Sequence, residues 1–445
     1  MTNLEQYILS KKNHHVVGVQ YGDEGKGSIT SKLINLFNLF NNNTNAYINN
    51  IRYGGGMQVG HTTFDGTTYI ENHGVPSGYH ILTKLRYPET KKINFFYTEN
   101  CVINIDILYN DLLFYQNKHK TYKIINLFPY SPVTTFLDVH ENRIQNIITN
   151  HGSTGMGFGK TVERFETTTL KFTLSDFFTN LHSKDLIIDQ LKQIANHYKI
   201  LIDEEFYSLA NDFYDKLLYI DDVLDINSNP EYIINGLNSI NIFEGHQGAL
   251  LDKDSSDFPH VTRSKTTCIL PISYFNNKLS NINLSNTPID TRNKLYNSLS
   301  GKGFNIVLSS TGSFITHMVT RIYSTRHGNG YFKIDPIVLK NNKNESNKFN
   351  PYQLEFKTSK LNFNDLERGI SYVIRDLCYN VISSETVIND YVNIFKNNLI
   401  LHVTCCDQVD LDYYYDTITK IENMKIIKDN NIRIKTHETN DFHIF

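Results

Sequence analysis

The feature that most constrains this chain is a glycine-rich loop, GDEGKG at residues 22–27, which separates a strand-like segment from a helix-like one. Residues 15–20 (HVVGVQ) are apolar and β-branched, as in a short buried strand. Residues 28–40 place apolar side chains at helical spacing, namely Ile29, Leu33, Leu36 and Phe40. Backbone N–H groups in such a loop can surround phosphate oxygens, and the helix start adds the positive end of its dipole. The sequence therefore predicts a strand–loop–helix phosphate site.

This loop departs from the ordinary phosphate loop GxxxxGK[ST]. Gln20 stands where that motif has its first glycine, and Gly27 stands where it has Ser or Thr. Lys26 is retained and supplies a positive charge for phosphates. Asp23 and Glu24 place carboxylates inside an anion site, which makes sense with a metal ion or with proton transfer. A charged surface turn is the plain alternative, but the flanking strand and helix favour a ligand site.

Strand-like apolar runs recur along the chain, with helical stretches between them. We expect strands at 46–53, 93–97, 241–245, 304–310 and 399–407, helices at 185–198 and 365–380, a turn at 41–45 and a polar loop at 340–351. Strands that alternate with helices imply a mostly parallel sheet covered on both faces. We predict one large α/β domain over residues 1–445, best supported over 15–410, on a mainly parallel central sheet with the variant phosphate loop after its first strand.

Composition excludes several classes of protein. The net charge of −3 argues against a dedicated nucleic-acid binder. The five cysteines are scattered and form no CxxC pair, which indicates a reduced protein. No apolar run approaches the roughly 18 residues of a membrane helix, and the first residues lack the apolar core of a signal peptide. We expect a soluble, cytoplasmic protein without a nucleic-acid or membrane partner.

Three further loops carry residues suited to chemistry. In GGGMQVGHT (54–62), His61 is flanked by Gly60 and Thr62 and is presented rather than packed; next to a phosphate loop it suits a general acid, although a lone histidine is more often structural. GSTGMGFG (152–159) suits a monophosphate cradle. Gln247 follows a strand in a tight turn, where its amide either reads a purine edge or stabilises the loop.

Taken in order, these segments resemble adenylosuccinate synthetase. VVGVQYGDEGKGS, RYGGGMQVGHTT, HGVPSG, GSTGMGFGK, FEGHQGALLD with FPHVT, and YSTRHGNG match the signatures of that family in the same order, and VTCCD falls where the family has its base-reading TKxD strand. The resemblance covers residues 15 to 410. It implies a single large α/β domain, usually homodimeric, that joins L-aspartate to IMP with hydrolysis of GTP. ATP is the other candidate triphosphate.

The resemblance also implies roles for individual residues. Asp23 would remove the N1 proton of IMP and ligate Mg²⁺, His61 would act as general acid, and the Gly60 carbonyl would be a second metal ligand. The triphosphate would be held by Gly22, Glu24, Gly25, Lys26, Gly27, Gly60, His61, Thr62 and Asp407. IMP would be held by Asp23, Gln58, Ser153, Thr154, Gln247 and Thr262, and aspartate by Lys357 and Thr358.

The residue types fit this chemistry without the family. The 6-oxygen of a purine is a poor leaving group, and phosphorylation makes it a good one. That transfer needs a base for N1, a metal ion to neutralise the transferring charge and an acid near the bridging oxygen. Asp23, Mg²⁺ and His61 would supply these three.

Several positions depart from the family pattern. The GRG loop reads GMG at 155–157, and the Arg-rich aspartate loop corresponds to 353–359, where only Lys357 is basic. The base-reading segment is TCCD at 404–407, which lacks the lysine, and no GP turn is evident near 435–445. Asp407 can still accept from guanine N1 and N2, so we expect a modest preference for GTP.

Three alternatives compete with this interpretation, and the first two remain open. A phage-type 2-aminoadenylosuccinate synthetase acts on dGMP, but in that relative the residue at position 23 is typically small, and Asp23 favours IMP. A catalytically weakened, nucleotide-binding regulatory protein fits the altered aspartate loop but not the intact Asp23, Lys26 and His61. A GTPase switch predicts GxxxxGK[ST] and NKxD, and the sequence has neither.

Overall fold

The computed structural model describes residues 1–40, 46–64, 66–83, 93–118, 125–149, 152–179, 183–226, 239–273, 314–340, 355–379 and 398–439. At its centre, nine strands of this described part form one sheet in the order β10-β8-β6-β2-β11-β1-β12-β15-β16. Every neighbouring pair is parallel. The strands are β1 (Asn13–Gly18), β2 (Tyr47–Arg52), β6 (Ile93–Tyr97), β8 (Ile125–Leu127), β10 (Asp225–Ile226), β11 (Ser239–Gly248), β12 (Phe314–Arg321), β15 (Leu399–Thr404) and β16 (Arg433–Thr436). The α/β fold on a mainly parallel sheet is thereby confirmed.

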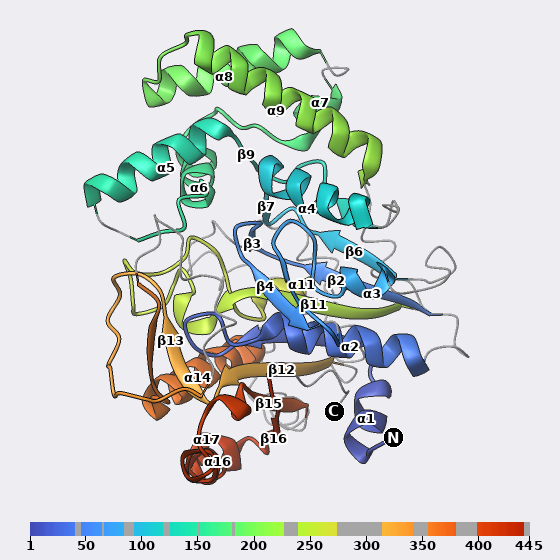
Figure 1. Cartoon of the computed structure of the whole chain (residues 1–445), viewed down its shortest axis with the longest axis vertical. Coiled ribbons are helices and arrows are strands. Elements are labelled where there is room, and N and C mark those ends of the chain that lie inside the picture. The colour runs from blue at the N-terminus through green and yellow to red at the C-terminus, as the bar shows by residue number, and fades with distance from the viewer. Residues whose placement is uncertain are drawn as a thin grey trace, which may run out of the picture.

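The sheet is buried on both faces, because successive side chains of each strand point to opposite sides. Val16 of β1 packs in one apolar cluster with Leu33 of helix α2 (Lys26–Phe40). Val17, the next residue, packs in a second cluster with Ile370 of helix α14 (Phe363–Tyr379). Two apolar cores therefore fix β1 within the sheet and α2, which begins at Lys26 of the phosphate loop, against one face of that sheet. Figure 1 shows α2 alongside the sheet.

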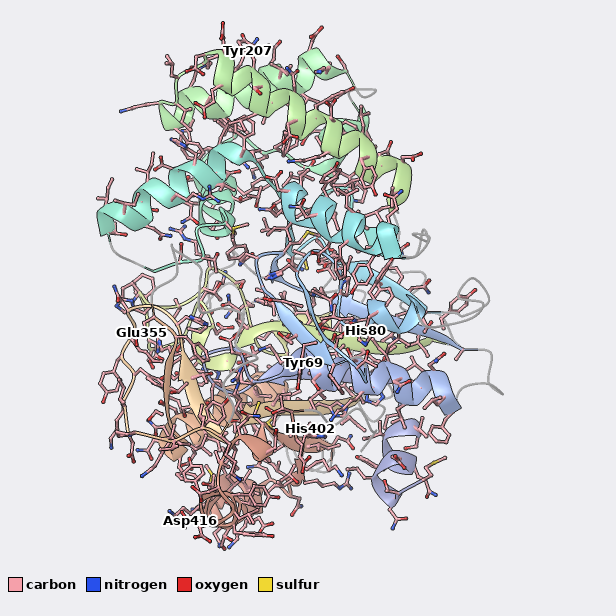
Figure 2. The ribbon with its side chains drawn as sticks, viewed as in Figure 1. Tyr69, His80, Tyr207, Glu355, His402 and Asp416 are labelled. Atoms are coloured by element: carbon pink, nitrogen blue, oxygen red, sulfur yellow. The ribbon has the colours of Figure 1, made fainter. Side chains whose placement is uncertain are left out.

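Helices gather at both ends of the molecule (Figure 1). One end holds α4 (Ile105–Lys118), α5 (Phe136–Thr149), α6 (Phe158–Thr167), α7 (Leu174–Thr179), α8 (Lys184–Tyr198) and α9 (Glu204–Val223), and the other holds α16 (Leu411–Asn423) and α17 (Lys425–Asp429). Tyr207 of α9 and Asp416 of α16 mark these opposite ends (Figure 2). No helix in the described ranges is long and apolar enough to span a membrane.

Short elements complete the chain around the sheet. The short helices are α1 (Asn3–Leu9), α3 (Tyr79–Thr83) and α11 (Ile269–Ser273), and the short strands are β3 (Gly55–Gly56), β4 (His61–Phe64), β5 (Tyr69–Asn72), β7 (Cys101–Asn104), β9 (Val133–Thr134), β13 (Tyr323–Arg326) and β14 (Lys357–Lys360). Strands β4 and β5 form an antiparallel hairpin, and β13 pairs with β14.

Most expected elements are confirmed, with two corrections. The strand expected at 399–407 ends at Thr404, because Cys405 adopts a left-handed backbone conformation with φ 58°. The central strand β12 was not predicted, because its sequence FITHMVTR mixes apolar with polar residues that the structure buries. The expected strand at 304–310, the turn at 41–45 and residues 341–351 of the expected loop lie outside the described residues.

Candidate functional site

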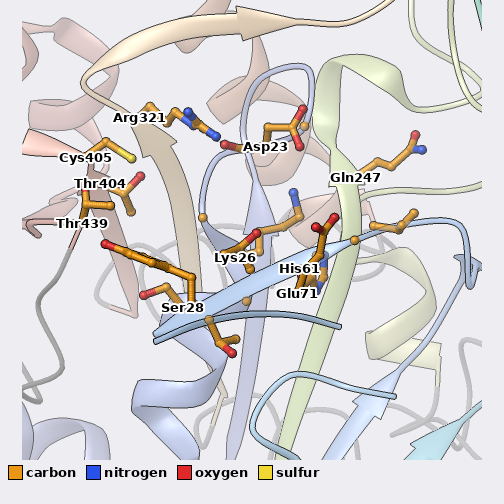
Figure 3. Close-up of a pocket in the computed structure, with 18 of the residues that line it drawn as sticks. Asp23, Lys26, Ser28, His61, Glu71, Gln247, Arg321, Thr404, Cys405 and Thr439 are labelled. Carbon is orange, nitrogen blue, oxygen red and sulfur yellow. Dashed lines mark hydrogen bonds between the residues drawn. The ribbon is translucent and has the colours of Figure 1, made fainter. Parts of the chain in front are cut away.

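One pocket lies at the carboxyl ends of β1, β12 and β15, where parallel sheets present ligand contacts. It encloses about 230 Å³. Eleven of the residues predicted for the site line it, namely Gly22, Asp23, Gly25, Lys26, Gly27, Gln58, Gly60, His61, Thr62, Thr154 and Gln247. Figure 3 shows Lys26 between Asp23 and His61 in this view. The fold therefore brings three loops that are remote in sequence to a single cavity.

The phosphate loop owes its shape to left-handed backbone turns and to a buried carboxylate. Gly22, Asp23 and Gly25 have φ of 96°, 58° and 94°. The side chain of Glu24 turns into the protein, where it accepts the N–H groups of Gln20 (3.1 Å) and Gly22 (2.9 Å) and pairs with Lys26 Nζ at 2.6 Å. The Glu24 carboxylate therefore stabilises the loop from inside the protein and does not line the pocket. Only the backbone amide of Glu24 is left for the predicted contact with the triphosphate.

Asp23 is held by groups from the far side of the pocket. Its Oδ2 lies 3.2 Å from Nε2 of His327, and its backbone carbonyl accepts from Nε of Arg321. Burial opposes ionisation of Asp23, but the close contact with His327 and the charges of His327, Arg321 and Lys26 outweigh it and lower the pKa of Asp23 to about 2. Asp23 is therefore a carboxylate at neutral pH, already paired with an imidazole.

His61 is oriented by a second buried carboxylate. Its Nδ1 contacts Oε1 of Glu244, whose Oε2 accepts from the Asn50 amide at 3.0 Å and from the Ser77 N–H at 3.2 Å. Arg52 Nε lies 3.5 Å from Glu244, and the charges of Arg52 and His61 hold the pKa of Glu244 well below its usual range although burial opposes this. Burial lowers the pKa of His61, against the opposing charge of Glu244.

This arrangement leaves one ring nitrogen of His61 for a ligand. Nε2 of His61 is buried and has no hydrogen-bond partner among the described residues, and His61 lines the pocket. With Nδ1–H donating to the carboxylate of Glu244, Nε2 is the nitrogen that can exchange a proton with a substrate oxygen. The side-chain oxygen of Gln247 is likewise without a partner in this part of the chain.

Six predicted residues do not line the pocket: Glu24, Ser153, Thr262, Lys357, Thr358 and Asp407. Ser153 bonds to Asn142 and Asn146, and Thr262 contacts Ser264. Lys357 donates to the Gly328 carbonyl at 3.0 Å from β14. These side chains are therefore engaged within the protein.

Asp407 is engaged in the same way, beside the pocket. Its Oδ1 accepts the Thr439 N–H and hydroxyl, each at 2.6 Å, and Oδ2 accepts the Gln408 amide at 2.9 Å. Gln408 and Thr439 themselves line the cavity. Asp407 therefore does not line the cavity in which we expected it, but it contacts two residues that do.

Comparison with known proteins places this geometry in a family. The family model described as Adenylosuccinate synthetase matches residues 15–283, more than half of the chain. The chain belongs to the adenylosuccinate synthetase family. Adenylosuccinate synthetases of Thermoplasma volcanium and of Cyanothece sp. are 28% and 27% identical to it, over 56% of the chain in each case and 54% and 53% of their own lengths. The chain thus matches about half the length of these curated relatives.

Two solved structures share the fold over more of the chain. Fully ligated adenylosuccinate synthetase from Plasmodium falciparum has a TM-score of 0.58 and 16% identity, and covers 89% of this chain and 77% of its own. The succinoaminodeoxyadenylate synthetase of cyanophage S-2L, bound to dGMP and to dATP as an energy donor, has a TM-score of 0.54 and 12% identity, over 96% and 91%. Both extend the likeness of fold beyond residue 283.

The residues expected to hold Mg²⁺ suit that ion. Mg²⁺ prefers oxygen ligands and is usually bound through one or two carboxylates together with substrate phosphates. Asp23 and Gly60 line the same pocket as the phosphate loop, with Glu71 as a further carboxylate. Within the described residues no three His, Cys, Asp or Glu side chains form a metal cluster. Such a site would depend on phosphate oxygens for the rest of its ligands.

Two partners in this synthetase-family site were missed by sequence reasoning. Glu244 lies in the quoted FEGHQG segment and His327 in YSTRHGNG, but neither was given a role. A carboxylate near the end of the strand expected at 241–245 was the available signal for Glu244, although β11 itself continues to Gly248. No local signal identifies His327, because its partner Asp23 is brought to it only by the pairing of β1 with β12.

Proposed function

We propose that this protein is a ligase that joins L-aspartate to IMP with hydrolysis of a nucleoside triphosphate, through a 6-phosphoryl-IMP intermediate, to give adenylosuccinate. One observation carries the proposal: the Asp23 carboxylate, the Lys26 ammonium and Nε2 of His61, which has no partner among the described residues, share one pocket. Phosphoryl transfer to a purine 6-oxygen needs a base, a cation and an acid, and these three groups supply them.

The chain's residues divide the reaction as follows. Asp23 accepts the N1 proton of IMP, which makes the 6-oxygen nucleophilic. That oxygen forms a bond to the γ-phosphorus while the bond to the β,γ-bridging oxygen breaks, and the nucleoside diphosphate leaves. Lys26 and the loop amides stabilise the negative charge of the transferred group. Mg²⁺, when bound by Asp23, the Gly60 carbonyl and phosphate oxygens, would neutralise charge on the triphosphate.

His61 serves the same transfer from the other side of Lys26. In its protonated form, which the Glu244 carboxylate favours, His61 donates Nε2–H to oxygen on the transferring phosphoryl group while Nδ1–H stays on Glu244. In the second half-reaction the aspartate amine bonds to C6, inorganic phosphate leaves and the amine loses a proton. The homodimer follows from the family resemblance, the cytoplasmic location from cysteine usage and the apolar pattern, and the modest preference for GTP over ATP from the resemblance together with Asp407; all three are parts of this proposal.

A second candidate substrate is dGMP. The fold is shared with a phage synthetase whose solved structure holds dGMP and dATP, at 12% identity. Against it, Asp23 leaves less room beside the purine than a small residue would. The deciding experiment is a product assay on purified protein with IMP or dGMP, GTP or ATP, and a panel of amino acids. Adenylosuccinate from IMP and aspartate is the expected product; triphosphate binding without any ligated product would indicate the regulatory alternative.

A further inference from the structure

Four buried histidines form a continuous line of hydrogen bonds across the sheet. They are His14 on β1, His317 on β12, His402 on β15 and His437, which follows β16; we name them the histidine ladder. The Nδ1 atoms of His14, His317 and His402 lie 3.1, 2.9 and 2.8 Å from Nε2 of the next ring in the line. None of the four is more than 3% exposed. His402, which is fully buried, is labelled in Figure 2.

The ladder follows from strand register. His317 pairs with Val16, two residues beyond His14, and His402 pairs with Val319, two residues beyond His317. A two-residue step keeps side chains on one face of the sheet. The rings therefore climb diagonally across neighbouring strands, always on the same face.

The two ends of the ladder fix where its protons lie. His14 Nε2 lies 3.2 Å from the carbonyl oxygen of Lys11, which can only accept. Lys32 Nζ lies 3.1 Å from His437 Nδ1, and an ammonium group can only donate. A neutral imidazole has one donor and one acceptor. Both ends of the ladder therefore require the same direction of donation, in which each ring donates from Nε2 and accepts at Nδ1. The network assigns all four rings as neutral Nε2–H tautomers.

The surroundings keep these rings neutral. Burial lowers the pKa of all four, that of His14 to about 4. The positive charges of Lys32 and Lys435 lower the pKa of His402 and His437 further. His15 adds a smaller effect on His317. Protonation of any ring would set two N–H groups against each other and break the line.

The ladder ends at the wall of the pocket. His437, Glu438 and Thr439 line the cavity, and Thr439 is bonded to Asp407. Lys32 lies on α2, the helix that begins at Lys26. The ladder therefore connects this wall to the strand and helix on either side of the phosphate loop.

We propose that the histidine ladder and Lys32 are positioning residues, which hold residues 437–439 as a wall of the pocket and thereby set its affinity for the nucleoside triphosphate. An apolar line of side chains would cover this face of the sheet without the cost of burying polar rings. The inference rests on the proposed function for its choice of ligand, but not for the existence or direction of the ladder.

The main test replaces His402 in the middle of the ladder. His402→Phe keeps the ring size but removes the donor and the acceptor, so His317 and His437 each lose a partner. We expect the KM for the triphosphate to rise roughly 10-fold, because the two unpaired buried groups no longer hold residues 437–439 in place, while kcat changes much less. His402→Gln, which can donate and accept, should recover part of the affinity. An unchanged KM in folded His402→Phe would overturn the proposal.

His15→Phe is the matched control. His15 is the next residue on β1, equally buried, but its ring bonds to the Tyr53 hydroxyl at 2.9 Å on the other side of the sheet. It should leave the KM unchanged. An increase equal to that of His402→Phe would mean that any buried histidine has this effect, which contradicts the proposal.

Two measurements keep the test independent of folding and of the reaction. If His402→Phe does not fold, Lys32→Met removes the terminal donor of the ladder and must raise the same KM. Nitrogen-15 NMR of the wild-type histidines should show four neutral Nε2–H rings at pH 7, and a charged or Nδ1–H ring in the ladder would overturn the proposal. If the wild type ligates nothing, the proposed function fails, whereas calorimetric titration of GTP and ATP into wild type and Lys32→Met still decides the ladder's role.

Discussion

The carboxylate of Asp23 on the phosphate loop lies 3.2 Å from Nε2 of His327. His327 directly follows β13 and is 304 positions further along the chain than Asp23 (327 − 23). This pair places an imidazole beside the group proposed to take the N1 proton. It also accounts for much of the lowering of the Asp23 pKa. The pair therefore links the acid–base behaviour of the site to a residue outside the phosphate loop.

Asp23→Ala should abolish ligation while the fold is retained. The side chain is partly exposed to the pocket, so its loss removes the proposed base without disturbing the core. Loss of a general base typically costs about 10² to 10⁴ in rate. Steady-state kinetics with circular dichroism as the folding control would check this, and turnover within a few-fold of wild type would remove Asp23 from the mechanism.

His327→Val should move the acid limb of the pH–rate profile to higher pH. In the wild type His327 helps to hold the Asp23 pKa at about 2, so its loss raises that pKa toward the ordinary value. Asp23 must be ionised to act as a base, and activity is then lost at higher pH than in the wild type. The profile of kcat/KM for both proteins tests this. Superimposable acid limbs would show that the pair does not control the base.

His61→Asn should lower the rate of phosphoryl transfer far more than it weakens IMP binding. Nε2 of His61 has no partner in the described chain and lies in the pocket, where a substrate oxygen can receive its proton. Rapid-quench measurement of the chemical step, with IMP titration in parallel, separates the two effects. Collapse of IMP affinity with an unchanged chemical step would make His61 a binding residue only.

Glu244→Gln should reproduce part of the His61 defect. The carboxylate holds Nδ1 of His61 and is itself anchored by Asn50, Ser77 and Arg52. An amide keeps the size but loses the charge that favours the protonated imidazole, so we expect a kcat reduced by about 10-fold or more. Additive losses in the double variant with His61→Asn would contradict action through His61.

Asp407→Asn should change the ratio of GTP to ATP turnover. A carboxylate there can accept two guanine donors, whereas an amide presents one acceptor and a donor. In the structure both carboxylate oxygens of Asp407 accept hydrogen bonds, one from Thr439 and the other from Gln408. Contact between Asp407 and a purine base therefore requires that the base replace Thr439 as the donor. Rates with each triphosphate give the ratio directly. An unchanged ratio would leave Asp407 as an anchor for Thr439 alone.

Stability should fall as the pH drops from about 6.5, because the ladder histidines resist protonation only in the folded state. In the unfolded chain His14 binds its proton with a pKa near 6.5, whereas in the folded protein this pKa is about 4. The free energy of unfolding therefore decreases as the pH falls through this window, and His14 has no such effect above it. For His14 alone the loss is about 3 kcal/mol. Urea unfolding at several pH values measures the slope. His402→Phe should reduce that slope, and an equal slope in both proteins would contradict neutral ladder rings.

Local sequence patterns were enough for the elements that stand alone. The 22–27 loop, the strand before it and helix α2 follow from glycine spacing and apolar periodicity over a few residues. Strand β12 was missed because its polar residues are buried by neighbours that the sequence does not identify. Thr316, His317 and Thr320 are each no more than 1% exposed between β1 and β15.

The sequence by itself determined the phosphate loop, the parallel α/β class and the loops that carry Lys26, His61 and Gln247, because each depends on spacing within one segment. Only the tertiary structure decided what those side chains touch. It turned Glu24 inward, paired Asp23 with His327 and His61 with Glu244, and aligned the four ladder histidines, whose neighbours in the line are 303, 85 and 35 positions apart in the chain. The physical reason is that strand order and register set these distances, and both arise from packing of the two cores on opposite faces of the sheet.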